Sequence, residues 1–232
     1  MEARGWAFAL VAVTALTFAN TTTLGFVWDD HRVIEANPAV TDPARYGLRD
    51  ALRATWWGPS APAGSNRVWR PVTLVSFRVD RAVWGPSPSG HHVTNVALHA
   101  LVAALVFALA RRVLASRGAD HPLAAFGAAA FFALHPLRTD AVASIVGRAE
   151  SLAALGVLAA TLATLRATEG DAHDFSAPEA AWRRVGWAML AVVGCALGVG
   201  AKENAVVAPA WALAVAAFVA RRACVLAGLP VV

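Results

Sequence analysis

The sequence contains few charged residues and few cysteines. Only 15% of its 232 residues are Asp, Glu, Lys or Arg, whereas a soluble domain carries about a quarter. The two cysteines, Cys195 and Cys224, fall in or beside apolar segments. We interpret both as packing residues, and they imply no disulfide framework. The sequence also has no Gly-rich phosphate loop, dinucleotide-binding fingerprint or nucleophile elbow, so it gives no support to a nucleotide-using cytoplasmic enzyme.

Long apolar runs without charge take up most of the chain. Hydrophobic residues make up 58% of it, and the mean hydropathy is +0.54. A soluble helical bundle is the rival class, but its helices would show a polar face at helical period, and Leu101 to Ala110 and Val206 to Ala220 show none. We therefore predict an all-α, polytopic transmembrane helical bundle of about six spans, namely Trp6–Phe26, Val93–Ala110, Pro122–Leu134, Ser151–Leu165, Val185–Gly200 and Ala205–Ala220.

The third predicted span is the weakest, because it is short for the roughly 20 residues that a membrane helix needs. The first run continues to Phe26 without a clear small-residue cleavage site, which favours a membrane anchor over a cleaved signal peptide. A seventh apolar segment begins near Ala223, so we expect the whole chain, 1–232, to be one membrane module at the N-terminal end of a longer protein.

The basic residues predict the orientation in the membrane. With six spans, nine Lys and Arg residues fall on the side of the N-terminus and three in the short loops of the opposite side. Short cytoplasmic loops keep positive charge, so we expect a cytoplasmic N-terminus, in either a bacterial inner membrane or the endoplasmic reticulum. This topology also accounts for the net charge of +5 without nucleic acid as a partner.

The first external connection, about 27–90, differs from the other loops. It holds eight arginines and five tryptophans. Tyr46 to Trp57 has apolar residues at helical spacing with arginines between them, a pattern typical of a helix lying on the membrane surface. We therefore expect this loop to carry interfacial helices.

Asp29 and Asp30 directly follow the first span. Neighbouring carboxylates raise one another's pKa, which prepares such a group for base work. The alternative interpretation is a solvated loop start or a helix cap.

The second and third external connections carry further charges. Arg138, Asp140, Arg148 and Glu150 lie between two apolar runs and predict a short interfacial helix over a cavity, in which the two guanidiniums are suited to a phosphate. Surface ion pairs of little energetic weight are the alternative. Lys202, the only lysine, and Glu203 form the third connection. Ionisable groups so close to apolar runs usually have a role.

Histidines gather at the entry of the second span. His91, His92, Asn95 and His99 lack the carboxylate that a metal-binding spacing needs. We interpret them as hydrogen-bonding residues of the bundle interior and predict no metal site and no cofactor.

Six sequence blocks in order resemble the N-terminal membrane module of the transmembrane and tetratricopeptide-repeat proteins. This family is similar to the polytopic glycosyltransferases of the C superfamily, near the protein O-mannosyltransferases. The blocks are Phe26-Val27-Trp28-Asp29-Asp30 with Asn37-Pro38, Trp69-Arg70-Pro71-Val72-Thr73, His92-Val93-Thr94-Asn95-Val96-Ala97-Leu98-His99, His135-Pro136-Leu137-Arg138-Thr139-Asp140-Ala141-Val142, Val146-Gly147-Arg148-Ala149-Glu150 and Ala201-Lys202-Glu203.

The resemblance implies transfer of a sugar, mannose in this family, from a polyprenyl phosphate to Ser or Thr hydroxyls of an acceptor protein on the external or luminal face. It implies Asp29 as the catalytic base with Asp30 in support. It implies that Arg138, Arg148 and Lys202 bind the lipid phosphate. Asp140 and Glu150, with Glu203 and His92, would orient the acceptor or the arginines.

Two departures from the family pattern are visible. The helical repeats that follow this module in the family are absent, and the spans are too few for a complete enzyme of the superfamily. A fragment, or a shortened relative without activity, therefore stays open. The alternative function is a non-catalytic membrane scaffold or transporter subunit that retains the fold.

Overall fold

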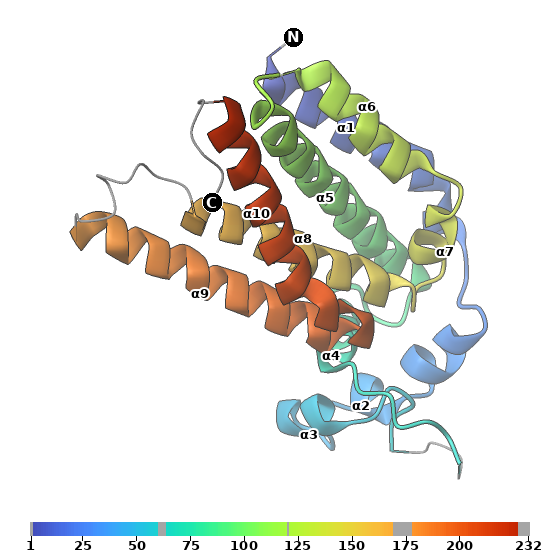
Figure 1. The fold of residues 1–232 in the computed structure, drawn as a ribbon. Helices are drawn as coiled ribbons and strands as arrows, with labels where there is room; N and C mark the ends of the chain where they lie inside the picture. The colour runs from blue at the N-terminus through green and yellow to red at the C-terminus, as the bar shows by residue number, and fades with distance from the viewer. Residues whose placement is uncertain (1, 60–63, 120, 169–177, 227–232) are drawn as a thin grey trace.

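The computed structural model describes residues 2–59, 64–119, 121–168 and 178–226, and this part of the chain is helical without strands. Figure 1 shows long helices packed side by side, with a group of short helices at the lower end. The long ones are α1 (Ala3–Phe18), extended by the 3-10 turn η1 (Ala19–Thr23), α5 (Pro88–Ala115), α6 (Pro122–Leu134), α8 (Arg148–Thr168), α9 (Pro178–Ala201) and α10 (Ala208–Leu226).

Within the described residues, five helical segments are long and apolar enough to cross a membrane: Ala3–Thr23, Pro88–Ala115, Arg148–Thr168, Glu179–Ala201 and Glu203–Ala220. The predicted fold class, an all-α transmembrane bundle, is confirmed. The third predicted span is the exception. It forms α6, whose 13 residues extend about 20 Å, less than the roughly 30 Å of a bilayer core. The predicted seventh segment falls largely on 227–232, outside the described residues.

Prolines mark several helix starts. Pro71, Pro88 and Pro122 each occupy the first turn of a helix, where the missing N–H has no helical partner to lose. α6 ends at Leu134, because the residue before Pro136 is driven out of the helical conformation. The sequence thereby sets where the chain turns at either end of the bundle.

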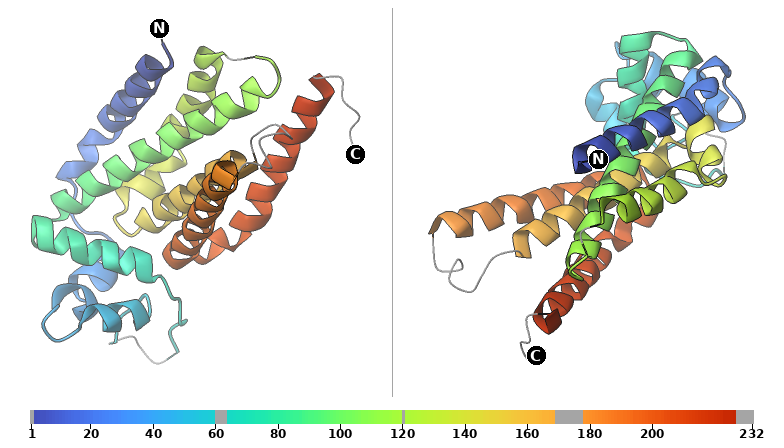
Figure 2. Two further views of the ribbon diagram at one scale, coloured as in Figure 1. Left: turned by 90° about the vertical axis from the view of Figure 1, so that its left-hand side faces the viewer. Right: turned by 90° about the horizontal axis from the view of Figure 1, so that it is seen from above.

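The long helices form two groups that meet at α5 and α8. α1 and α6 pack on α5, and α9 packs along α8. Leu10, Phe107 and Ala129 belong to the core of the first group, whereas Ala153, Ala201 and Ala205 belong to that of the second. Two further views separate the groups: α8 and α9 project away from the pair α1 and α5 (Figure 2).

The first external loop folds into a small helical layer at one end of the bundle. It contains a π-helical turn η2 (His31–Glu35), α2 (Pro38–Thr41), α3 (Leu48–Arg53) and α4 (Pro71–Trp84). The interfacial helix expected over Tyr46 to Trp57 is shorter than predicted, because only Leu48–Arg53 is helical. The longer α4 was not predicted.

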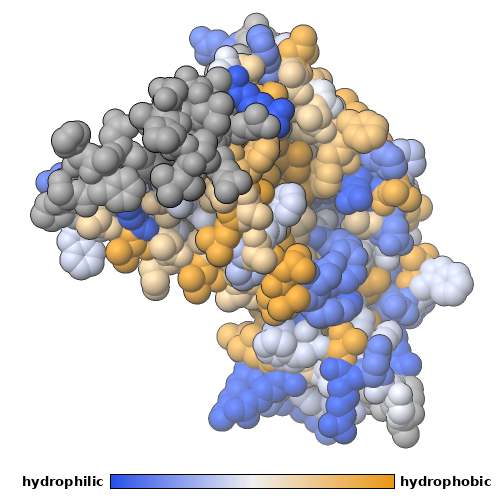
Figure 3. Space-filling view, viewed as in Figure 1, coloured by the Kyte–Doolittle hydropathy of each residue, from blue (hydrophilic) through white to orange (hydrophobic). Residues whose placement is uncertain are grey.

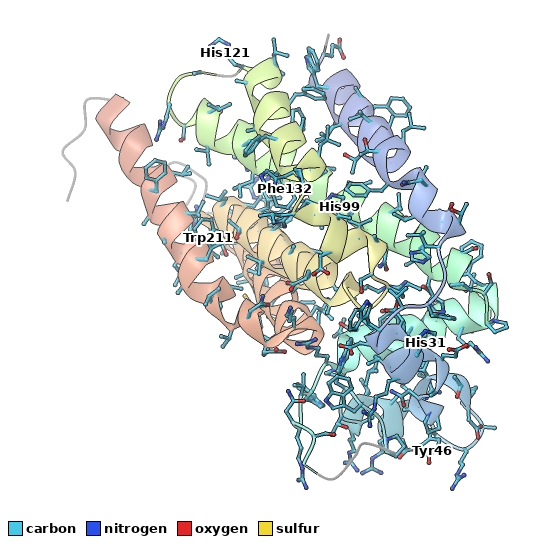
Figure 4. All side chains as sticks on the ribbon, turned by 90° about the vertical axis from the view of Figure 1, so that its right-hand side faces the viewer. His31, Tyr46, His99, His121, Phe132 and Trp211 are labelled. Atoms are coloured by element: carbon cyan, nitrogen blue, oxygen red, sulfur yellow. The ribbon has the colours of Figure 1, made fainter. Side chains whose placement is uncertain are left out.

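This layer has its own core, made of Val33, Ile34, Trp56, Leu74 and Phe77 together with Ile145 from the second external connection. Figure 3 shows hydrophilic residues gathered at the lower end, where the layer lies, and hydrophobic ones over the helices above it. Figure 4 places Tyr46 and His31 in this lower end, His121 at the opposite end, and His99 between them beside Phe132. The loop layer is thus a folded cap on one end of the bundle.

Candidate functional site

A cavity of about 670 Å³ lies where the three predicted external connections meet. The first connection contributes Trp28, Asp29 and Arg70, the second Asp140 and Glu150, and the third Lys202. Three carboxylates and two cations from distant parts of the sequence therefore line one space. The three connections thus come together in this fold.

The second connection supplies one wall through the short helix α7 (Arg138–Ala143). Its apolar residues Ala141 and Val142 are buried, while Thr139, Asp140 and Ala143 line the cavity. A short helix over a cavity was the prediction for this segment. Gly147 follows at a tight turn, where an added Cβ would lie 2.5 Å from the Asp140 carbonyl oxygen, so a larger residue would displace this wall.

Asp29 and Asp30 face different surroundings. Asp29 is exposed and lines the cavity. Asp30 is fully buried: it accepts a hydrogen bond from the Val27 backbone N–H at 3.1 Å and another from the Val146 backbone N–H at 2.8 Å. Asp30 therefore fastens the first connection to the second, which fixes the turn that presents Asp29.

The pKa of the Asp30 carboxyl is also shifted from its ordinary value. Burial raises its pKa above the ordinary value, against the opposing effect of the hydrogen bonds from Val146 and Val27.

Trp28, in the same turn, has a left-handed backbone with φ of 49° and a side chain that is 92% exposed. A non-glycine residue holds such a conformation only when its surroundings enforce it.

Arg148 does not line the cavity. Its side chain is fully buried, and its Nε donates to Asn95 Oδ1 at 2.7 Å. Its Nη2 donates to Asp80 Oδ2 at 2.5 Å and to the His91 carbonyl oxygen at 2.9 Å. With its guanidinium 4.8 Å from the centre of the Phe77 ring, Arg148 has no face left for a lipid phosphate.

The partner carboxylate, Asp80 on α4, was not predicted from the sequence. Burial acts to raise its pKa, yet contacts with His91 and Arg148 outweigh burial and bring the pKa below its ordinary value. Asp80 also accepts a hydrogen bond from Thr94 Oγ1 at 2.8 Å. This ion pair joins α4, α5 and the start of α8 directly beneath the cavity wall.

Asn95 extends the same network to the second connection. Its Nδ2 lies within 3.3 Å of the carbonyl oxygens of Val142, Ser144 and Ile145 and donates to them. The prediction that the histidines and Asn95 lie in the bundle interior is confirmed: His91, His92, Asn95 and His99 are all buried. His92 is therefore absent from the cavity wall.

The third connection brings Lys202 to the cavity, whereas Glu203 lies outside the residues that line it; each forms an ion pair. Lys202 Nζ contacts Glu150 Oε1. Arg70 makes a two-point contact with Glu203, its Nε donating to Oε2 at 3.0 Å and its Nη2 to Oε1 at 2.7 Å. Thr73 Oγ1 donates to the Ala201 carbonyl oxygen at 2.9 Å, which ties the start of α4 to the end of α9.

Arg70 is the cavity cation that sequence reasoning did not assign. Its guanidinium lies 4.9 Å from the centre of the Trp56 ring. The residue belongs to the block Trp69-Arg70-Pro71, which is part of the family resemblance. Arg138, by contrast, lies beside the Phe132 ring at 5.0 Å, outside the residues that line the cavity. Across the described ranges no group of three His, Cys, Asp or Glu side chains has a metal-binding arrangement.

Comparison with known proteins gives several relatives. The chain is 40% identical over 156 residues to protein O-mannosyl-transferase Tmtc1 of Drosophila melanogaster, covering 67% of this chain and 17% of that protein. It is 34% identical over 169 residues to protein O-mannosyl-transferase TMTC1 of Homo sapiens, covering 71% and 18%. With protein O-mannosyl-transferase TMTC3 of Mus musculus it shares 31% over 163 residues, covering 70% and 17%. The matches thus span about a sixth of the length of these relatives. No protein-family model matches the chain, and no solved structure does.

Proposed function

The chain is related over about two thirds of its length to the protein O-mannosyl-transferases of the transmembrane and tetratricopeptide-repeat family, and on that premise we propose that its cavity is a site of mannosyl transfer to proteins. The donor in this proposal is a mannosyl polyprenyl phosphate, and the acceptor is a Ser or Thr hydroxyl. The reaction takes place on the membrane face opposite the N-terminus, external or luminal.

The observation that carries the proposal is the composition of the cavity wall. An exposed carboxylate, Asp29, shares one cavity with the cations Arg70 and Lys202. Glycosyl transfer from a lipid phosphate needs both kinds of group: a base for the acceptor hydroxyl and fixed positive charge for the departing phosphate.

In the proposed reaction the acceptor oxygen attacks the anomeric carbon of the sugar, and the bond between that carbon and the phosphate oxygen breaks. The electron pair of that bond stays on the phosphate, and the acceptor proton moves to Asp29. Asp140 and Glu150, which line the same cavity, are suited to orient the acceptor peptide or the sugar hydroxyls.

The phosphate contacts of this proposal differ from those expected from the sequence. Lys202 keeps its predicted role in binding the phosphate, and Arg70 takes the place of the buried Arg148. Arg138 lies outside the cavity wall, and its phosphate role stays a prediction. Lys202 and Arg70 are paired with Glu150 and Glu203. These carboxylates are partly exposed, with side-chain accessibilities of 40% and 59%, so a donor phosphate can compete for the cations at modest cost.

The test is transfer of radiolabelled mannose in membranes that contain the full-length gene product. We expect transfer from mannosyl polyprenyl phosphate to Ser- or Thr-containing peptides, and none to the same peptides with Ala at those positions. Transfer equal to that of membranes without the protein would overturn the proposal and favour the scaffold or transporter function.

A further inference from the structure

Trp28 carries two energetic costs that the turn around it does not require. Its backbone has a φ of 49°, a left-handed conformation that glycine adopts freely and that a side chain with a Cβ resists. Among the described residues no other non-glycine has a positive φ. Its indole is 92% exposed, the largest fraction for any large hydrophobic side chain in the described part of the chain. Strained residues of this kind gather at ligand-binding sites, where their position is part of the function.

The turn that holds Trp28 is closed by its neighbours. The Asp30 backbone N–H donates to the Val27 carbonyl oxygen at 2.9 Å. The Asp30 carboxylate accepts from the Val27 backbone N–H at 3.1 Å through Oδ2, and from the Val146 backbone N–H at 2.8 Å through Oδ1. These bonds do not use the Trp28 side chain, so glycine would suit the turn better. The presence of tryptophan therefore indicates a contact that the indole itself makes.

The indole lies in the wall of the cavity between the three external connections. Trp28 lines this cavity together with Asp29, the proposed base. The other aromatic residue among the described lining residues is Trp56. Trp56 is only 3% exposed, and its ring already lies 4.9 Å from the guanidinium of Arg70. Trp28 is therefore the aromatic surface that this wall leaves open to a ligand.

The proposed reaction brings a sugar within reach of this ring. A general base acts at about 2.6 to 3.2 Å from the hydroxyl whose proton it takes, and reacting atoms lie about 3 to 3.5 Å apart before the bond forms. The anomeric carbon is thus within roughly 7 Å of the Asp29 carboxylate. Because neighbouring Cα atoms are about 3.8 Å apart, the indole of Trp28 covers the same space. One face of a pyranose ring consists of C–H groups, which suit the electron-rich face of an aromatic ring.

We propose that Trp28 binds the sugar of the donor by stacking on its pyranose ring. This inference rests on the proposed function and names the residue that recognises the sugar. The cations Arg70 and Lys202 contact the phosphate, which the donor shares with the polyprenyl phosphate left after transfer. Trp28 contacts the part that only the donor has. It therefore distinguishes the donor from the spent lipid, which favours exchange of one for the other after each transfer.

A tryptophan close to the end of a span is also typical of the membrane interface. Trp28 follows the span that ends at Thr23 by five residues. A residue that only anchors the chain at the headgroups needs no left-handed backbone and no place in a cavity wall. The strain and the position of Trp28 therefore favour a ligand contact over an anchor.

The test is equilibrium binding of mannosyl polyprenyl phosphate and of polyprenyl phosphate, with the same lipid chain, to the full-length protein in nanodiscs. The wild type should bind the mannosyl lipid more tightly. Trp28→Leu keeps an apolar side chain without a planar face, and it should lower this preference about three- to tenfold, the factor that an aromatic contact contributes. Trp28→Tyr should retain most of the preference. Trp182→Leu, at a 76% exposed position of α9 outside the cavity wall, is the control and should leave it unchanged.

Trp28→Gly separates binding from backbone strain. It should leave the unfolding temperature unchanged or raise it, since glycine adopts the left-handed conformation freely, and yet it should lose the preference as Trp28→Leu does. An unchanged preference in Trp28→Leu, the result expected of a membrane anchor, would overturn the inference. Equal affinity of the wild type for both lipids would also overturn it. Transfer of radiolabelled mannose is measured separately, so the proposed function can stand when the role of Trp28 fails.

Discussion

The adjacent residues Asp29 and Asp30 illustrate how burial separates two like side chains. One is exposed in the cavity, and the other is fully buried between two backbone N–H groups. Sequence alone marks the pair, because two carboxylates follow a span. It does not tell which of them turns inward, since that depends on Val146, 116 residues away.

The first prediction concerns this pair. Asp29→Asn should lower the rate of mannosyl transfer about 100- to 10,000-fold, because the amide cannot accept the proton of the acceptor hydroxyl. It should leave thermal stability unchanged, since Asp29 is exposed. Asp30→Asn should instead cost about 1 to 3 kcal/mol of stability, as one of its two buried hydrogen bonds is weakened or lost.

Transfer rate and thermal unfolding of both variants, measured on the same preparations, distinguish these roles. Full turnover in Asp29→Asn would move the base to Asp140 or Glu150. Equal loss of stability in both variants would mean that the pair only shapes the turn.

The second prediction separates Arg148 from Lys202. Arg148→Met should destabilise the protein by about 3 to 5 kcal/mol, because it leaves Asp80 as a buried charge without its partner. Lys202→Met should unfold at nearly the wild-type temperature, since its ion pair is partly exposed. It should weaken donor binding by about 1 to 3 kcal/mol through the loss of a charged contact to phosphate.

Donor affinity and the unfolding midpoint, both measured in detergent, test this prediction, with Arg49→Met, an exposed arginine outside the residues that line the cavity, as the control. If Arg148→Met unfolds like the wild type, the buried ion pair of Arg148 and Asp80 contributes nothing to the stability of the fold. If Lys202→Met binds donor unchanged, Lys202 has no phosphate role.

At the scale of elements, α8 and α9 form the most extensive contact between helices in the described part of the chain. A Cβ added to Gly156 would lie 2.6 Å from the Gly194 carbonyl oxygen and 2.6 Å from the Gly198 Cα. Only glycine permits this approach of two backbones. Because α8 begins with Arg148 and α9 ends just before Lys202, the contact also sets the spacing of the cavity walls.

The third prediction follows from this contact. Gly156→Ala should push the helices apart, lower the unfolding temperature and reduce transfer, since overpacking costs about 1 to 3 kcal/mol. Gly186→Ala on α9 is the matched control: nothing lies within 4 Å of its added Cβ, so it should be neutral or slightly stabilising. A Gly156→Ala variant as stable and active as Gly186→Ala would show that the helices can separate without consequence.

The elements differ in how well the sequence predicts them. The apolar runs identified the long helices. Residues that face lipid need no distant contact partner, so their pattern can be recognised from the local sequence alone. α4 was missed, since its Asp80 and arginines resemble an ordinary polar loop until Asp80 is paired with Arg148. That pair spans 68 residues, and no local pattern encodes it. Arg70 was visible as part of a family block, but its position on the cavity wall depends on Glu203, 133 residues away.

At the scale of the whole molecule, the cavity requires three connections on one side of the membrane. The fourth prediction is therefore topological. In a protein without Cys195 and Cys224, single cysteines at Thr23, Thr139 and Asn204, all exposed, should be labelled by an impermeant maleimide from the side opposite the N-terminus. A cysteine at Arg117, also exposed, should be labelled only after the membrane is opened.

Labelling of the Thr139 position from the same side as the Arg117 position would contradict this topology. It would place the second connection away from Asp29 and Lys202, and the composite cavity could not form in the membrane.

The hydrogen bond from Val146 to Asp30 also has a consequence for biosynthesis. At a synthesis rate of about 5 to 20 residues per second, the 116 residues between the two partners take roughly 6 to 23 seconds to emerge. For that interval Asp30 lacks its partner, and Arg70 waits longer, because Glu203 follows it by 133 residues. The folded cap is therefore assembled in stages, and its cavity is complete only after the last of the three connections has been synthesised.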